Sequence, residues 1–272
     1  MPAWDRVVGK ISDFIRDFVN EAGAEGVVVG VSGGVDSACV AKLCTIALGS
    51  ERVFALIMPE NGVTPEEDVE DALNLCDELG VERKIIEISP AISSICELLD
   101  CRREGIPFAN LKPRVRMILL YYHANSMNRL VAGTGNRSEL LAGYFTKYGD
   151  GGVDFLPIGD LYKTEVFQLA EYLGIPERIR KKKPSARLWS GQTDEEEMGI
   201  SYSELDSILM AMEELGLLEK VEKGEVGKED LIPVADKSGA ELRKVELVAE
   251  MVKNSAHKRC MPPLVSVRGL LR

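Results

Sequence analysis

A glycine-rich turn between a short apolar strand and a helix constrains this chain more than any other feature of its sequence. The run Val27–Val31 is rich in β-branched residues and predicts a buried strand. A helix is expected from about Ser37 to Leu48. Small residues in the turn let the backbone approach a ligand, and N–H groups at a helix start point toward bound oxygens. An anion site is therefore expected at the octet Gly30-Val31-Ser32-Gly33-Gly34-Val35-Asp36-Ser37.

The octet differs from the better-known phosphate loops. It lacks the lysine that G-x-x-x-x-G-K-[ST] requires, and it does not fit G-x-G-x-x-G, so dinucleotide binding of the Rossmann type is not expected. An aspartate in such a loop would repel phosphate unless a cation lay between them, so Asp36 is interpreted as a magnesium ligand. The alternative is a tight strand-to-helix turn in which Asp36 is only a charge at the helix N-terminus.

Strands and helices alternate along the chain. Further strands are predicted at Val53–Met58, Lys84–Ile88 and Arg129–Ala132, with a candidate fifth at Phe155–Ile158. We therefore predict an α/β fold with a doubly wound, mostly parallel, Rossmann-like sheet and helices on both faces, in a single domain over residues 1–272. Residues 185–199 are predicted to form a long surface loop. The apolar C-terminal end is expected to dock on the domain.

Composition narrows the classes of function. The net charge of −11 argues against nucleic acid as a partner. No apolar run approaches the roughly 20 residues of a membrane helix, and the N-terminus lacks the pattern of a signal peptide, so we expect a cytoplasmic protein without a membrane partner. The six cysteines form no C-x-x-C pair, and the chain has two histidines. A zinc site is therefore not expected, and the thiols are predicted to be reduced and mostly buried.

The octet resembles the signature S-G-G-x-D-S of the ATP pyrophosphatase superfamily (N-type). Its members include NAD synthetases, GMP synthetases, asparagine synthetases and tRNA-modifying enzymes, and the octet alone does not choose among them. Further blocks narrow the choice, because together they resemble NAD synthetases in order and over nearly the whole chain. These blocks are Gly133–Glu139, Phe145–Asp154 with F-T-K-Y-G-D-G-G, Leu156–Lys163, Pro184–Trp189 with Gly191–Glu195, and His257–Arg259.

This resemblance implies an ammonia-dependent ligase with an adenine nucleotide alpha hydrolase-like fold. Such an enzyme amidates deamido-NAD to give NAD, AMP and pyrophosphate through an adenylated intermediate, as the last step of NAD biosynthesis. Deamido-NAD, ATP and ammonia would be its substrates and Mg²⁺ its cofactor. A homodimer is also implied, with the deamido-NAD site at the subunit boundary and the helix at Arg116–Tyr122 as a contact.

The resemblance further implies roles for individual residues. The octet would bind ATP, with Asp36 and Lys163 as catalytic residues and with Asp36 and Glu139 as magnesium ligands. Because the loop has no lysine of its own, Lys163 can supply the missing cation. Many bacterial relatives have an acidic residue after the threonine of the Gly133 block; this chain has Gly135 there, which leaves Glu139 as the expected partner of Asp36. ATP contacts are implied at Thr134, Lys163 and Ser185, and deamido-NAD contacts at Arg116, Lys147, Asp154, His257 and Lys258.

Each of these residues also has a simpler structural interpretation. Glu139 fits a charge in the first turn of a helix. Lys147, Lys163 and His257, each taken alone, fit solvated surface side chains. Arg116 is as compatible with a surface charge as with a substrate contact. The basic run Arg178–Lys183 is predicted to cover a helix C-terminus.

Other functions stay open at this point. Another adenylating amidotransferase is the nearest alternative, whereas a tRNA thiolase would need reactive cysteines and a basic face. A sensor that binds ATP without turnover is an alternative of another class. The blocks leave no room for an added amidase domain, since domains need at least about 50 residues. Free ammonia rather than glutamine is therefore the expected nitrogen source, with a separate amidase subunit left open.

Overall fold

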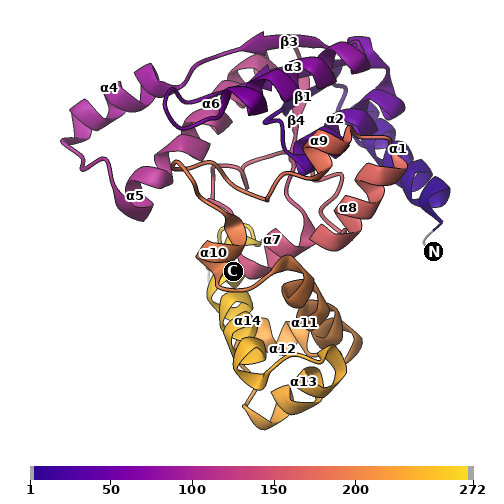
Figure 1. Ribbon diagram of the computed structural model, residues 1–272, viewed down its shortest axis with the longest axis vertical. Coiled ribbons are helices and arrows are strands. Elements are labelled where there is room, and N and C mark those ends of the chain that lie inside the picture. Colours follow the sequence, from indigo (N-terminus) through magenta and orange to yellow (C-terminus); the bar gives the residue numbers. More distant parts are fainter. Residues whose placement is uncertain (1–2, 269–272) are drawn as a thin grey trace. The chain divides into compact units, whose positions relative to one another are not determined.

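A parallel β-sheet forms the centre of the larger part of the molecule. The computed structural model describes residues 3–268. The strands lie in the order β3-β2-β1-β4 and all run parallel. Figure 1 labels β1, β3 and β4 among the surrounding helices. Val28 of β1 stands opposite Phe54 of β2 and Val131 of β4. The strands are β1 (Gly26–Gly30), β2 (Val53–Ile57), β3 (Glu82–Ile85) and β4 (Arg129–Ala132).

Side chains that alternate along the strands contribute to two cores, one on each face of the sheet. Val27 and Val29 pack in the first core, and Val28 and Phe54 pack in the second. Because helices cover both faces, the predicted doubly wound α/β fold is confirmed. The first core contains residues of α1 (Trp4–Glu21), α2 (Val35–Leu48), α3 (Glu66–Leu79), α8 (Lys163–Tyr172) and α9 (Glu177–Arg180), and the second contains residues of α4 (Ser89–Leu99) and α6 (Leu111–Ser126).

Two predicted strands differ from the observed ones. The strand β3 ends at Ile85 rather than at Ile88. Phe155–Ile158 is not a strand, because Phe155 forms a single bridge to Ala132 and the chain then turns. The turn is closed by a hydrogen bond from the Gly159 N–H to the Leu156 carbonyl at 3.1 Å. Pro157 lies in this turn and has no N–H that could donate a hydrogen bond to a neighbouring strand.

Short helices fill several connections. The predicted surface loop at residues 185–199 is partly helical, because its last third forms α10. The short elements are η1 (Ser50–Arg52), α5 (Gly105–Ala109), α7 (Arg137–Ala142), α10 (Asp194–Met198), α12 (Leu218–Lys223), η2 (Glu229–Leu231), α13 (Ile232–Ser238) and η3 (Ala256–Lys258).

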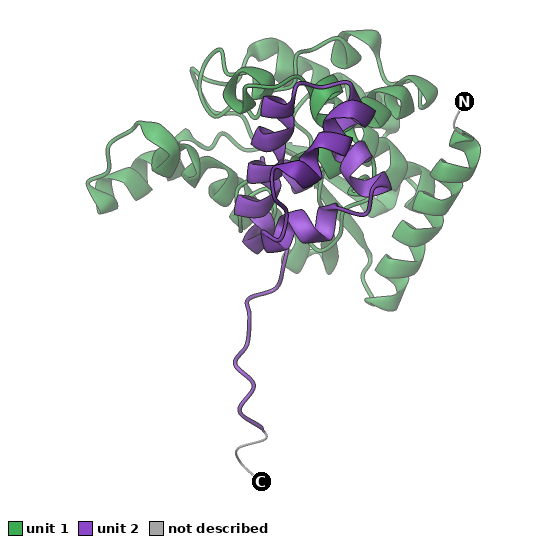
Figure 2. Cartoon of the chain, turned by 90° about the horizontal axis from the view of Figure 1, so that it is seen from below, with its two compact units in different colours: residues 1–139, 145–206 green, residues 140–144, 207–272 purple. Residues whose placement is uncertain are grey.

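The chain divides into two compact units (Figure 2). Unit 1 comprises residues 1–139 and 145–206 and contains the sheet, and unit 2 comprises residues 140–144 and 207–272. Unit 2 is helical and includes most of α11 (Tyr202–Glu214), with α12, α13 and α14 (Leu242–Ser255). Its buried side chains include Val221, Val234, Val245, Val248 and Val252. A single domain over residues 1–272 stays a prediction.

The C-terminal end does not dock as expected. Met261 is 85% exposed, Leu264 94% and Val265 84%, so this apolar segment has little contact with the rest of the chain. The last residues of the expected docking segment, 269–272, lie outside the described residues. Among residues 3–268, no helix is both long enough and apolar enough to cross a bilayer.

Candidate active site

The sheet places two loops side by side where its strand order reverses. The chain leaves β1 through α2 toward β2, whereas β4 lies on the other side of β1 and is reached from β3. The carboxyl ends of β1 and β4 therefore lie at the point where the strand order reverses, which is where α/β sheets of this kind bind ligands. The octet follows β1, and the block Gly133–Glu139 follows β4, so the topology brings two of the predicted blocks together.

Hydrogen bonds among its own residues hold the octet Gly30–Ser37 in shape. We call this segment the phosphate loop after its predicted role. The Ser32 N–H donates to Ser37 Oγ at 3.2 Å, and the Ser37 hydroxyl donates to the Gly34 carbonyl at 3.0 Å. Gly33 has φ +78°, and a Cβ on it would lie 2.2 Å from the backbone oxygen of Asp68. Only glycine fits there, because both the left-handed conformation and the close contact exclude a side chain.

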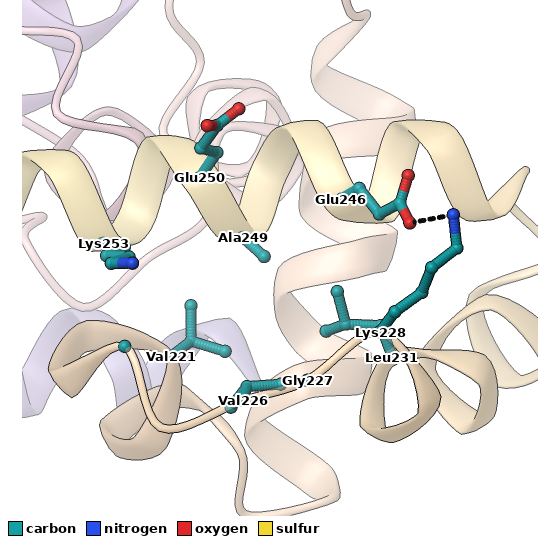
Figure 3. A pocket seen from close by; sticks show the side chains of 10 residues that line it. Val221, Val226, Gly227, Lys228, Leu231, Glu246, Ala249, Glu250 and Lys253 are labelled. Atoms are coloured by element: carbon teal, nitrogen blue, oxygen red, sulfur yellow. Dashed lines mark ion pairs between the residues drawn. The ribbon is translucent and has the colours of Figure 1, made fainter.

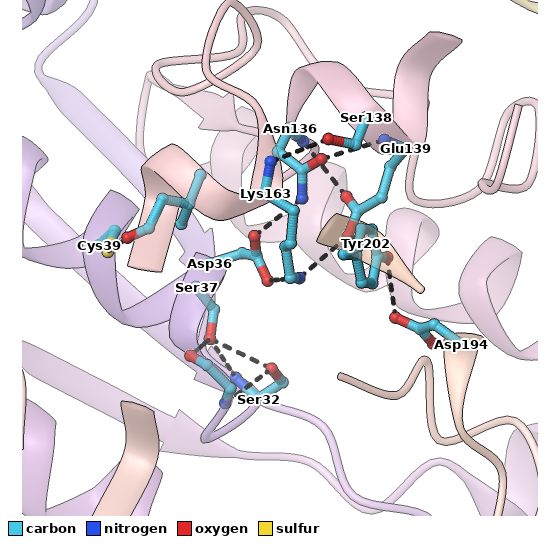
Figure 4. Close-up of polar contacts among 12 residues, drawn as sticks. Ser32, Asp36, Ser37, Cys39, Asn136, Ser138, Glu139, Lys163, Asp194 and Tyr202 are labelled. Carbon is cyan, nitrogen blue, oxygen red and sulfur yellow. Dashed lines mark hydrogen bonds and ion pairs between the residues drawn. The ribbon is translucent and has the colours of Figure 1, made fainter. Parts of the chain in front are cut away.

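Lys163 lies between the two carboxylates that the sequence predicts as magnesium ligands. Its Nζ is 2.5 Å from Asp36 Oδ2 and 3.3 Å from Glu139 Oε1 (Figure 4). The Lys163 side chain is only 2% exposed. Burial alone would lower the pKa of this ammonium group, but Asp36 and Glu139 outweigh burial and raise the pKa. Burial is the main reason that the pKa of Glu139 rises to about 8.

Asn136 orients both carboxylates. Its side-chain amide donates to Asp36 Oδ1 at 3.0 Å, and its backbone N–H donates to Glu139 Oε2 at 3.2 Å. The Glu139 N–H in turn donates to Asn136 Oδ1 at 3.0 Å. The remaining oxygen of each carboxylate faces Lys163. Asn136 lies within a block that the sequence analysis used, but no role was predicted for it.

Residues beyond the recognised blocks complete the site. The Tyr202 hydroxyl donates to Asp194 Oδ2 at 3.1 Å, and its ring lies 5.0 Å from Lys163 Nζ. Asp206 accepts hydrogen bonds from the Ser138 hydroxyl and, at 2.8 Å, from the Thr164 N–H. Asp206 therefore caps the start of α8, the helix that Lys163 begins. Sequence analysis missed Tyr202 and Asp206, because neither lies in a local pattern that indicates a site.

The other predicted residues of unit 1 have local partners. Arg116 donates from Nε to the Met58 carbonyl at 3.1 Å, and burial lowers its pKa. Lys147 lies over the Tyr148 ring at 5.4 Å. Asp154 accepts from the Tyr121 hydroxyl at 3.0 Å and from a backbone N–H of β4 at 2.7 Å.

The remaining predicted residues lie in loops or in unit 2. Thr134 is half-buried in the loop after β4. Ser185 Oγ accepts from the Arg187 N–H at 3.2 Å. His257 and Lys258 lie in η3, within unit 2, where Lys258 Nζ donates to the Gly143 carbonyl at 2.7 Å.

A pocket in unit 2 contains none of the predicted residues. The ion pair between Lys228 and Glu246, at 2.6 Å, lies at its edge (Figure 3). Its lining is Val221, Gly224, Val226, Gly227, Lys228, Leu231, Glu246, Ala249, Glu250 and Lys253.

The donor set at Asp36 and Glu139 fits magnesium that is shared with a substrate. Residues 3–268 contain no group of three or more His, Cys, Asp or Glu side chains arranged to hold a metal. Mg²⁺ is commonly held by one or two carboxylates together with substrate phosphates. Asp36 Oδ2 and Glu139 Oε1 already face one cationic group, the Lys163 ammonium, so the pair suits a cation bound in this shared way.

Comparisons with known proteins agree with this geometry. The family described as NAD synthase matches residues 7–262. The NH(3)-dependent NAD(+) synthetase of Archaeoglobus fulgidus is 62% identical over 270 residues, which cover 98% of this chain and 99% of that protein. The solved NH3-dependent NAD synthetase of Campylobacter jejuni is 34% identical with a TM-score of 0.78, covering 98% of this chain and 100% of that one. The solved NMN synthetase of Francisella tularensis is 33% identical with a TM-score of 0.82. The match covers 97% of this chain and 99% of that one. Matches of this extent, on a chain whose phosphate loop opens beside the Asp36–Lys163–Glu139 cluster, show that the chain belongs to the NAD synthase family.

Proposed function

We propose that this chain converts deamido-NAD to NAD with ATP and ammonia, releasing AMP and pyrophosphate. One observation carries the assignment of the site: a buried ammonium group, Lys163 Nζ, lies at the end of the octet, where it contacts Asp36 and Glu139 together. A loop that lacks its own lysine thus receives a cation from α8. A buried ammonium group of this kind is held in place before the substrate binds. It can therefore stabilise negative charge that develops on the substrate during the reaction.

ATP would bind with its phosphates along the octet. The start of α2 has no side-chain cap, which leaves its first N–H groups for a ligand, and the hydroxyls of Ser32 and Ser37 fix the shape of the loop. Asp36 and Glu139 would hold Mg²⁺, which when bound neutralises charge on the phosphate oxygens. Thr134 and Ser185 are proposed as further ATP contacts.

The reaction then has two steps. An oxygen of the nicotinate carboxylate forms a bond to the α-phosphorus while the bond to the pyrophosphate oxygen breaks, and Lys163 stabilises the departing charge. Ammonia next forms a bond to the carbonyl carbon, the bond to the AMP oxygen breaks, and a proton leaves the nitrogen. The described residues contribute mainly by positioning the reactants and by neutralising charge.

Deamido-NAD would be held by Arg116, Lys147, Asp154, His257 and Lys258. Of these, Arg116, Lys147 and Lys258 would supply the cationic partners that the phosphates and the free carboxylate require. We also infer a homodimer in which α6 lies at the boundary. Ile118 is 58% exposed and Tyr122 68% exposed on this helix, so both apolar side chains are accessible for such a contact. A cytoplasmic location suits an enzyme whose described cysteines are all free thiols.

The alternative functions are less well supported. Four of the six cysteines are buried, and burial raises the pKa of the Cys76 thiol to about 11, which does not suit the reactive thiolate of a thiolase. A sensor that only binds ATP would not need the blocks beyond the octet.

The test is turnover by the purified chain with ATP, Mg²⁺, ammonium and deamido-NAD, followed by chromatography of the nucleotides. AMP, pyrophosphate and NAD are expected in equal amounts. Nicotinate mononucleotide in place of deamido-NAD distinguishes the dinucleotide from the substrate that an NMN synthetase would use. ADP and phosphate as products would contradict adenylation, and comparable rates with ammonia-free glutamine would contradict the use of free ammonia.

A further inference from the structure

Three cations near the phosphate loop have no role in the proposed reaction. Arg178 lies in α9, and Lys182 and Arg187 lie in the loop that follows it. The basic run does contain the end of α9, as expected, but two of its side chains, Arg178 and Lys182, pair with acids near the start of α3. Arg178 Nε is 2.7 Å from Asp71, and Lys182 Nζ is 2.6 Å from both Asp68 and Asp71.

Asp68 lies directly against the phosphate loop. Its side chain is 4% exposed, and both carboxylate oxygens have cationic partners. Lys182 Nζ donates to Oδ1 at 2.6 Å, and Arg187 Nε donates to Oδ2 at 2.8 Å. The backbone oxygen of Asp68 occupies the space where Gly33 would carry a Cβ, and Lys182 Nζ also lies 3.3 Å from the Gly33 carbonyl. Asp68 is thus joined to the loop through its backbone and through Lys182.

The other partner of Asp68 holds the turn that carries Ser185. Arg187 has φ +51°, a left-handed conformation that is uncommon for a residue with a long side chain. Such conformations persist where the surrounding structure holds them, and they occur often at binding sites. Here the Arg187 side chain is bound by Asp68, and its N–H donates to Ser185 Oγ at 3.2 Å.

We propose that Asp68 is a positioning residue that fixes the Ser185 turn relative to the phosphate loop, so that both can contact one ATP molecule. The inference rests on the proposed function, in which the octet and Ser185 both bind ATP. Lys182 braces the loop rather than binding phosphate, because Asp68 and Asp71 already neutralise its charge. Asp68 itself does not touch the substrate.

The first test is Asp68→Asn, which keeps the size of the side chain and removes its charge. The KM for ATP should rise roughly tenfold, the effect of losing one charge-assisted hydrogen bond. The KM for deamido-NAD and the kcat at saturating ATP should stay within about twofold of the values of the unmodified protein. Arg187→Met should give the same pattern, and Arg187→Lys should recover part of the loss because a lysine can still pair with Asp68.

Arg178→Met is the matched control. It removes an arginine–aspartate pair of nearly the same length, 2.7 Å against 2.8 Å, whose aspartate, Asp71, lies on α3 like Asp68, but Arg178 lies in α9 and not in the Ser185 turn. In this variant the ATP KM should stay within about twofold of that of the unmodified protein, even if the melting temperature of the variant falls. In the double variant of Asp68→Asn and Arg187→Met, the ATP KM should rise no further than in the more affected single variant, because both changes break one link.

The proposal would be overturned by additive effects in the double variant, or by an ATP KM that rises in Arg187→Met but not in Asp68→Asn, because Arg187 would then contact ATP itself. If Asp68→Asn does not fold, Asp68→Glu keeps the charge and lengthens the link by one methylene. A raised ATP KM in that variant supports positioning, and an unchanged one contradicts it. Ser185→Ala tests the premise separately: an unchanged ATP KM there refutes the proposed ATP site, whereas a raised one with an unaffected Asp68→Asn refutes only the positioning role.

Discussion

Lys163 keeps a buried charge because its neighbours compensate for the lost water. Asp36 and Glu139 contact its ammonium group, and the face of the Tyr202 ring lies 5.0 Å away. Removing one partner of a buried ion pair leaves the charge of the other less well compensated, which typically costs up to about 3–5 kcal/mol. Substitutions at Asp36 should therefore reduce the stability of the fold as well as the rate of the reaction.

Lys163→Met tests the contribution of the charge to catalysis. The kcat for adenylation should fall by about 10²–10³, the usual effect of removing one preorganised group that stabilises charge in the transition state. The measurement is pyrophosphate release at saturating ATP and deamido-NAD. Arg137→Met, which removes a half-buried cation of α7 that pairs with Asp160 at 2.7 Å, serves as the control. A variant of Lys163 with near-normal kcat would show that this residue is not catalytic.

Glu139 should make the stability of the metal-free protein depend on pH. Its pKa is about 8 in the folded protein, above the ordinary value of 4.5, so the folded protein keeps a proton that the unfolded chain releases between these values. The free energy of unfolding therefore falls as the pH rises through this range. Glu139→Gln cannot lose the proton, so its melting temperature in the presence of a chelator should exceed that of the parent by more at pH 8 than at about pH 5. If the melting temperatures of the two proteins differed by the same amount at both pH values, the raised pKa of Glu139 would be contradicted.

The chemistry-bearing residues near the carboxyl ends of β1 and β4 could be predicted because they lie in contiguous blocks. Asp36, Glu139 and Lys163 belong to three such blocks, and the structure brings them within bonding distance. Tyr202 and Asp206 could not be predicted in this way. Each contributes one side chain from α11, and its role depends on distances that only the fold creates.

At the scale of secondary-structure elements, the order of strands and crossover helices was well predicted because β-branched runs and helical periodicity are local signals. The helices of unit 2 were mostly missed. In α11, Leu205, Ile208, Leu209 and Met212 are fully buried and follow helical spacing, so the sequence did contain this signal. The helices α12 and α13 have six and seven residues, too short for a periodic pattern to stand out.

Gly33→Ala tests the fit of the phosphate loop against α3. A left-handed residue with a side chain costs about 1–2 kcal/mol, and a Cβ here would also clash with a backbone oxygen at 2.2 Å, which cannot move aside easily. We expect a lower melting temperature and a large loss of ATP binding. Gly62→Ala is the control, because Gly62 has φ +77° but no atom within 4 Å of the added Cβ. Equal losses of stability in both variants would show that the clash is relieved.

At the scale of the whole molecule, the inferred dimer makes a prediction about assembly. Tyr122→Glu combined with Ile118→Glu places two charges on the exposed apolar face of α6 and should shift the protein toward a monomer in sedimentation experiments. Ile232→Glu, at a 47% exposed apolar residue of unit 2, should leave the sedimentation coefficient unchanged. An active monomer of the unmodified protein at working concentrations would contradict the dimer.

Two helices are shared between the compact units, and this limits how the chain can be cut or recombined. The first half of α7 carries Ser138 and Glu139 in unit 1 before the chain enters unit 2, and α11 begins with Tyr202 and Asp206 before it does the same. Excising unit 2 would interrupt both helices, and it would leave only the first turn of the 13-residue helix α11. Such a turn is not stable alone, since isolated helices shorter than about 12 residues are marginal. Unit 2 is therefore not a module that a gene fusion could remove or exchange: a truncation after residue 206 would cut α11 directly after Tyr202 and Asp206, and so destabilise the segment from which Asp206 caps α8 and the Tyr202 ring contacts Lys163.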